Sequence, residues 1–234
     1  MAYSPSSRAR GASSRTRLGW LLCTVIAALL APKSALALEQ ESQTWITTRF
    51  LAPLGEHSDV GFRFRTRFSG VFKERSLYQY QFTAAHYLRD NLRIEGGYEQ
   101  FRSRDQRLED RWLGQVQLRN FWGGGLFRHR VRLELRDLVA LDDPVYRLRY
   151  LLAHRRPISE TGRYIELRNE VFVSLSEKGG LERGIVQNRI GATLGQRFGD
   201  RWRAEFRYQW GYIDSSLITR GDHLLQLNLI WDGR

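Results

Sequence analysis

The sequence predicts an all-β protein, an antiparallel up-and-down transmembrane β-barrel of about 10–12 strands. Three observations lead to this prediction. Segments of about ten residues alternate apolar and polar side chains and are separated by turn-forming residues. The first 37 residues have the pattern of a secretory leader. The polar face of the alternating segments is dominated by arginine, whereas the apolar face carries tyrosine and tryptophan near the segment ends.

The stretch RWRAEFRYQWGY, residues 201–212, alternates over its whole length. Its aromatic residues share one face of a strand and its arginines share the other, because successive side chains of a strand point to opposite faces. Trp202 and Tyr212 lie ten residues apart. That separation is roughly 33 Å along a strand. A tilt of about 40° reduces it to about 25 Å, the height of a lipid-facing band between two aromatic girdles.

Residues 1–20 are rich in Ser and Arg and contain no acid, and an apolar run follows over residues 21–31. Ala35-Leu36-Ala37 then provides a small-x-small cleavage site. The apolar run is too short to span a bilayer as a helix. We therefore expect residues 1–37 to be a secretory signal peptide for the Sec pathway. We expect residues 38–234 to form one β-barrel domain in the bacterial, Gram-negative outer membrane. Cleavage would also remove Cys23, the only cysteine.

The chain is basic, with a formal net charge of +12. Loss of five basic residues with the leader lowers this charge to +7. Nucleic acid is a common partner of basic chains, because Lys and Arg neutralise phosphates, but export argues against it here. Only three of the 37 basic residues are lysines. Arginine's planar fork suits pairing with carboxylates and bound anions, so the positive charge has a structural or binding role.

Eleven candidate strands follow one another without a helical stripe or a linker. They cover residues 43–52, 60–68, 77–87, 92–101, 110–119, 127–136, 145–153, 164–175, 184–194, 201–212 and 222–231. Single-chain bacterial barrels carry an even number of strands. We therefore expect either that the first candidate lies outside the wall, leaving ten, or that a weak strand is missing, giving twelve.

The connections predict the orientation of the barrel. Links near residues 89, 123 and 198 are tight, whereas links near residues 105, 140, 180 and 217 are longer. Tight turns belong to the periplasmic side of such barrels and longer loops to the exterior. With a periplasmic C-terminus, the second to eleventh candidates form a consistent set of ten strands.

A soluble periplasmic β-protein is the alternative fold, because its strands also alternate. Its outward polar face would carry mixed Lys, Glu, Ser and Thr. Here the polar face holds sixteen arginines against six acids, which favours the membrane barrel. The six acids are Glu95, Glu99, Glu134, Glu166, Glu170 and Glu205. A closed barrel is also the only sheet that satisfies every backbone group in lipid.

Several stretches in a consistent order resemble members of the bacterial family called domain of unknown function 2490. They are QTW at 43–45, RHRVRLELR at 128–136, RLRY at 147–150, RNEVFVSL at 168–175, QNRIGATLGQRF at 187–198 and HLLQLNL at 223–229. Together they span nearly all of the chain beyond the leader. Members of the family are regarded as outer-membrane β-barrels. The resemblance implies this fold and compartment and brings no known activity.

The excess of arginine suggests the function. Six acids cannot pair with sixteen arginines, so about ten guanidinium groups need water, carbonyl oxygens or anions. Rings of arginine select anions in pores. We expect a small, porin-like passive pore or a binder of anionic solutes. The expected lumen residues are Arg63, Arg65, Arg67, Arg128, Arg130, Arg132, Arg147, Arg149, Arg203 and Arg207. The expected partners are outer-membrane lipid, lipopolysaccharide, the barrel-insertion machinery and small anionic solutes, and not nucleic acid.

Two other functions stay open. Arginines and glutamates could cross-link and plug the lumen, giving a structural or adhesion barrel without transport. A hydrolase at the rim would need the cluster Asp214, Ser215, Ser216, Asp222 and His223, which no spacing motif marks. The other histidines suit turns or girdles better than a metal site. The chain lacks GxGxxG, P-loop, HExxH and zinc-type spacings, so we expect no enzyme activity, no cofactor and no metal.

Overall fold

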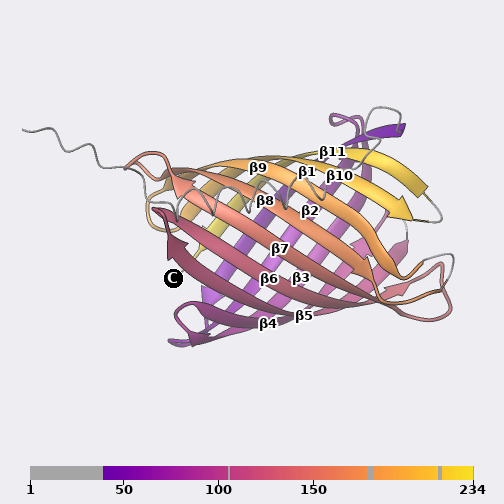
Figure 1. The fold of residues 1–234 in the computed structure, drawn as a ribbon, viewed down its shortest axis with the longest axis horizontal. Coiled ribbons are helices and arrows are strands. Elements are labelled where there is room, and N and C mark those ends of the chain that lie inside the picture. Colours follow the sequence, from indigo (N-terminus) through magenta and orange to yellow (C-terminus); the bar gives the residue numbers. More distant parts are fainter. Residues whose placement is uncertain (1–38, 105, 179–181, 216–217, 234) are drawn as a thin grey trace, which may run out of the picture. The chain divides into compact units, whose positions relative to one another are not determined.

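The computed structural model describes residues 39–104, 106–178, 182–215 and 218–233, so the expected signal peptide lies outside it. The described residues form eleven strands that close into one barrel (Figure 1). The strands are β1 (Glu39–Pro53), β2 (Ser58–Ser69), β3 (Glu74–Arg89), β4 (Leu92–Arg102), β5 (Arg107–Trp122), β6 (Gly125–Leu138), β7 (Val145–Pro157), β8 (Arg163–Ser174), β9 (Gly184–Phe198), β10 (Trp202–Ser215) and β11 (Ile218–Asp232). No helix of these residues is long and apolar enough to cross a membrane.

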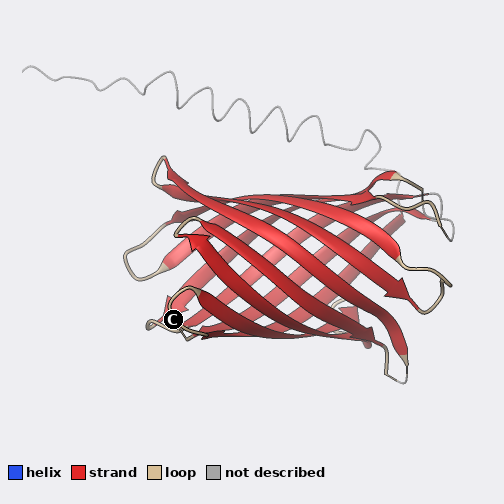
Figure 2. Cartoon of the chain, turned by 90° about the horizontal axis from the view of Figure 1, so that it is seen from below, coloured by secondary structure: helices blue, strands red, loops and turns tan. Residues whose placement is uncertain are grey.

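Each strand pairs antiparallel with the next along the chain, and the strands run obliquely around the barrel (Figure 2). A single parallel pairing, between β1 and β11, closes the wall. The all-β barrel expected from the alternation is therefore confirmed, and so is its mostly antiparallel order. All strands except β8 are longer than expected, because pairing continues past the regular alternation into the polar residues at the strand ends.

The expectation of an even strand number is wrong for the described residues, as are both explanations of the odd count. The first candidate lies within the wall, where Trp45 of β1 is opposite Arg67 of β2 on one side and Gln226 of β11 on the other. An up-and-down chain with an odd number of strands has its first and last strands running in the same direction. Such a barrel can close only through a parallel pair.

The links fall at the two ends of the barrel as expected. Residues 90–91, 123–124 and 199–201 form short turns at the end where β11 terminates. Gly123 and Gly124 have φ values of 60° and 76°, a backbone conformation that glycine adopts at little cost. Links 103–106, 139–144 and 175–183 lie at the opposite end. The expected long loop near residue 217 is wrong, because β10 and β11 extend until only residues 216–217 join them.

The wall has two chemically different faces, as the alternation predicted. Large apolar residues are exposed on the outside along the strands, including Trp112 at 60%, Phe82 at 56% and Leu194 at 54% of their surface. Aromatic pairs also lie there: the rings of Phe62 and Phe82, and those of Tyr98 and Trp112, are 5.0 Å apart. The inward face is polar, and most of the buried charged and amide side chains lie on it.

One glycine makes room for a buried tyrosine inside the barrel. Gly195 of β9 lies opposite Tyr164 of β8, and a Cβ atom at Gly195 would lie 2.1 Å from Tyr164 Cζ. The Tyr164 hydroxyl donates a 2.6 Å hydrogen bond to Glu205 Oε1. The missing side chain of Gly195 therefore lets the tyrosine ring lie flat on the wall and reach Glu205.

We expect Gly195→Ala to lower the free energy of unfolding by about 1–3 kcal/mol, because the added methyl group would displace the Tyr164 ring. Gly114→Ala is the matched control, since no atom lies within 4 Å of a Cβ built there. Urea unfolding of the refolded barrel, followed by tryptophan fluorescence, measures both variants. Equal stability of the two variants would show that Tyr164 can be accommodated elsewhere.

Candidate functional site

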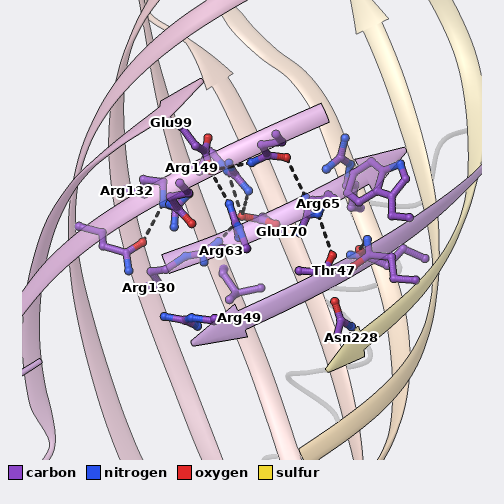
Figure 3. Close-up of a pocket in the computed structure, with 18 of the residues that line it drawn as sticks. Thr47, Arg49, Arg63, Arg65, Glu99, Arg130, Arg132, Arg149, Glu170 and Asn228 are labelled. Atoms are coloured by element: carbon purple, nitrogen blue, oxygen red, sulfur yellow. Dashed lines mark hydrogen bonds and ion pairs between the residues drawn. The ribbon is translucent and has the colours of Figure 1, made fainter. Parts of the chain in front are cut away.

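The inward face surrounds a cavity of about 460 Å³, which is within the range of small-molecule sites. All ten arginines expected in the lumen line this cavity. They come from β2, β6, β7 and β10, where inward residues alternate with outward apolar ones. Figure 3 shows some of them, including Arg63, Arg65 and Arg130, with the groups that they contact. That these arginines contact anions stays a prediction.

Seven further arginines line the same cavity and were not among the expected site residues. They are Arg49, Arg93, Arg111, Arg136, Arg155, Arg168 and Arg189. Most of them lie on the polar face of an expected strand, so the same alternation rule applied to every strand would have found them. Arg155 lies beyond the expected end of its strand, residue 153, and only the longer β7 places it in the lumen.

Eight buried acids form ion pairs with these arginines. They are Asp59, Glu95, Glu99, Glu109, Glu134, Glu166, Glu170 and Glu205. All six expected acids are included. Asp59 and Glu109 were missed because each precedes an expected strand by one residue. With seventeen arginines lining the cavity and eight acids paired to them, nine positive charges are in excess among these groups.

Glu134 of β6 is the centre of the densest part of the network. It is completely buried. Its Oε2 accepts hydrogen bonds of 2.8 and 2.6 Å from Nε and Nη2 of Arg147, and its Oε1 accepts one of 2.6 Å from Nη1 of Arg149. Arg111 Nη1 and Arg132 Nη1 lie 3.7 and 3.6 Å from the same Oε1. One carboxylate therefore faces four guanidinium groups.

Glu170 of β8 continues the network along the wall. Its Oε1 accepts hydrogen bonds from Arg149 Nη2 at 2.7 Å and from Arg130 Nη2 at 2.5 Å (Figure 3). Glu99 of β4 accepts a 2.8 Å hydrogen bond from Arg111 Nη1 and forms an ion pair with Arg63. Such bidentate and shared carboxylates are the strong form of the ion pair, because each bond is charge-assisted.

The cavity arginines of β1, β2 and β9 include several with neutral partners. Arg65 donates hydrogen bonds to Thr47 Oγ1 at 3.0 Å and to Gln79 Oε1 at 3.3 Å. Among the described residues, Arg49, Arg65 and Arg189 form no ion pair with an acid, although all three line the cavity. The counter-charges are therefore distributed unevenly, with most of them on β4 to β8 and β10.

Asp222 and His223 of the suggested hydrolase cluster lie on opposite faces of the wall. Asp222 is buried in the interior and pairs with Arg220, whose Nε lies 2.9 Å from its Oδ1. His223 is on the opposite face, where its ring nitrogens are 2.8 Å from the Tyr208 hydroxyl and 2.9 Å from Gln40 Oε1. Ser216 lies outside the described residues. In the part of the chain that is described, no three His, Cys, Asp or Glu residues form a metal-binding group.

Comparison with known proteins supports the family resemblance that the sequence stretches indicate. A search of curated proteins found no match. The family model described as "Protein of unknown function (DUF2490)" matches residues 42–220. This range includes most of β1, all of β2 to β10 and the start of β11, which is well over half of the chain. The chain therefore belongs to the DUF2490 family.

Proposed function

We propose that this barrel spans the bacterial outer membrane and passes or binds small anionic solutes through its arginine-lined lumen. One observation carries the proposal: a cavity of about 460 Å³ persists inside the barrel although its wall holds a dense ion-pair network. The cavity lining extends from Arg203 near one end of the wall to Leu138 near the other. Its excess positive charge favours anions over cations.

The geometry of the ion pairs explains why the cavity persists. The pairs between wall residues join strands close to one another around the barrel, as in Arg63 of β2 with Glu99 of β4 and Arg128 of β6 with Glu166 of β8. The most widely separated partners among the described pairs are Arg155 of β7 and Glu205 of β10, which have two strands between them in the wall. Among the described residues, the network thus follows the wall, and no ion pair joins opposite sides of the barrel.

Unsatisfied donors support a polar occupant of the lumen. Among the described residues, the buried Nε atoms of Arg63, Arg128, Arg130 and Arg168 have no hydrogen-bond partner within the protein. Buried polar groups usually find a partner in protein or water. Water admitted from the cavity into the ion-pair network would supply acceptors for these N–H groups.

The outward face supports the membrane location. Its apolar side chains form a continuous surface along the strands, with Val131 and Leu133 each 47% exposed near the middle of β6. Soluble proteins rarely expose contiguous apolar surface on this scale. Lipid and lipopolysaccharide are the environment that this surface suits, and delivery there requires export by the N-terminal leader and the barrel-insertion machinery.

A plugged structural barrel is the second candidate. The observation that favours it is that at least thirteen of the seventeen cavity arginines are held in ion pairs. Side chains fixed in this way can fill a small barrel. Under this alternative the barrel folds normally and conducts nothing.

The test is the single-channel conductance of the refolded mature chain in a planar bilayer under a salt gradient. We expect stable steps with a reversal potential that indicates anion selectivity. Combining Arg49→Gln with Arg65→Gln should reduce that selectivity without leaving an acid unpaired, because neither arginine pairs with a described acid. Arg156→Gln is the control, since Arg156 is exposed on the outward face.

Two outcomes would contradict the pore. A barrel that migrates as folded on a heat-modifiability gel but shows no conductance would establish the plugged form. Conductance that is unselective, and unchanged in the double variant, would show that the excess arginines do not govern passage.

A further inference from the structure

A tryptophan lies within the lumen rather than on the outward face. Trp45 of β1 is only 3% exposed and lines the cavity. Three guanidinium groups lie over its ring: the Cζ atoms of Arg65, Arg67 and Arg189 are 4.6, 4.3 and 5.5 Å from the ring centroid. We call Trp45 and these three arginines the Trp45 cluster. It brings together β1, β2 and β9, which are not all neighbours in the wall.

Two neutral amides contact the arginines of the Trp45 cluster. Gln79 Oε1 accepts hydrogen bonds from Arg65 Nη1 at 3.3 Å and from Arg67 Nη2 at 3.2 Å. The Gln187 amide, oriented with its oxygen toward Arg189, accepts from Nε and Nη2 of that arginine at 3.2 Å. These amides satisfy some donors but contribute no negative charge.

The positive charges of Arg65 and Arg189 favour an anion at the cluster. Like charges gathered in a poorly solvated interior repel one another, and the face of an aromatic ring offsets this only in part. A guanidinium stacked on a ring has its donors at its edge, directed away from the ring face. For most other arginines of the lumen, a carboxylate accepts hydrogen bonds from these donors, as Glu170 does from Arg130 and Arg149. Among the described acids, none does so for Arg65 or Arg189.

We propose that the Trp45 cluster binds a small tetrahedral oxyanion with two negative charges, of the sulfate or phosphate class. The proposal rests on the proposed function in that solutes must be able to enter the lumen. Guanidinium forks hold pairs of oxygen atoms, so an oxyanion gains more hydrogen bonds than a halide does. Two negative charges match Arg65 and Arg189, neither of which forms an ion pair with a described acid, better than one charge does. Anions passing along the lumen would therefore dwell at this cluster.

The experiment is a titration of the refolded barrel with inorganic sulfate, followed by tryptophan fluorescence. Trp45 is the most buried of the described tryptophans, since Trp112, Trp122 and Trp202 are 60%, 52% and 40% exposed. Its emission should therefore respond to an anion in the lumen. We expect a saturable change with sulfate that chloride at equal ionic strength does not produce. Phosphate should compete with sulfate for the same signal.

Variants assign the signal to the cluster. Trp45→Phe should remove the fluorescence change, and Arg65→Gln or Arg189→Gln should weaken sulfate binding at least about tenfold, the effect of losing a charge-assisted contact. Arg65→Lys keeps the charge without the fork and should bind with intermediate affinity. Arg156→Gln on the outward face should bind as the wild type does. Heat-modifiable migration on a gel verifies that each variant is folded.

The outcomes separate this inference from the proposed pore. Anion-selective conductance without a saturable sulfate signal would overturn the binding site and leave the pore intact. A saturable sulfate signal in a barrel that does not conduct would support the site and reduce the function to binding. A sulfate signal that persists unchanged in Arg65→Gln and Arg189→Gln would place binding elsewhere and overturn the inference.

Discussion

Replacing Glu134 with Gln is expected to lower the free energy of unfolding of the barrel by about 3–5 kcal/mol. The buried carboxylate accepts hydrogen bonds from Arg147 and Arg149 and lies within 3.7 Å of Arg111 and Arg132. Glutamine keeps the shape but removes the charge and turns one acceptor into a donor that faces other donors. Four buried guanidinium groups would then lose their shared counter-charge. Urea unfolding of the refolded protein measures the difference.

The matched control is an exposed ion pair of the same chain. Asp143 and Lys178 lie 2.6 Å apart, with side chains 65% and 49% exposed. We expect Asp143→Asn to change stability by less than about 1 kcal/mol, since water screens such a pair. If Glu134→Gln lowered the free energy of unfolding as little as Asp143→Asn, the lumen would have to be solvated well enough for water to replace the carboxylate.

We expect Val131→Arg to lower the free energy of unfolding of the barrel in a lipid bilayer by about 2–4 kcal/mol. Val131 is 47% exposed near the middle of β6. A charge there would lie near the centre of the hydrocarbon layer if the outward face meets lipid. In a barrel surrounded by water, the same substitution would place an arginine on an exposed surface at almost no cost.

The control for that substitution lies just beyond the same strand. Val139 is 56% exposed in the link that follows β6, so arginine at this position should be nearly neutral. Denaturant titrations of both variants, folded into lipid vesicles, provide the comparison. Equal stabilities would contradict the membrane location, because the depth dependence of the cost is specific to a bilayer.

The alternation predicted which face each arginine occupies with little ambiguity. A strand has a period of two, so Arg63, Arg65 and Arg67 must share a face once β2 is recognised. The strand ends were harder to predict. Asp59 and Glu109 are polar residues at the ends of β2 and β5, and no apolar partner marks them as part of a strand. Both are nevertheless buried acids of the network.

The partners within the network could not be predicted from the sequence. Arg63 and Glu99 are 36 residues apart, and Arg130 and Glu170 are 40 apart. Whether two such residues meet depends on the register of every strand between them, and a shift of one residue turns a side chain to the other face. The Trp45 cluster depends in addition on the closure of the barrel. Trp45 on β1 meets Arg189 on β9 only because β1 and β11 pair.

The strand count has a topological consequence for the ends of the chain. In a barrel with an even number of hairpin-linked strands, the first strand begins at the end where the last strand finishes. Here β1 and β11 run in parallel, so Glu39 and Asp232 lie at opposite ends of the barrel. Under the proposed outer-membrane location with a periplasmic Asp232, Glu39 would lie at the cell surface. A tag fused directly before Glu39 and one fused after β11 would therefore lie at opposite ends of the barrel.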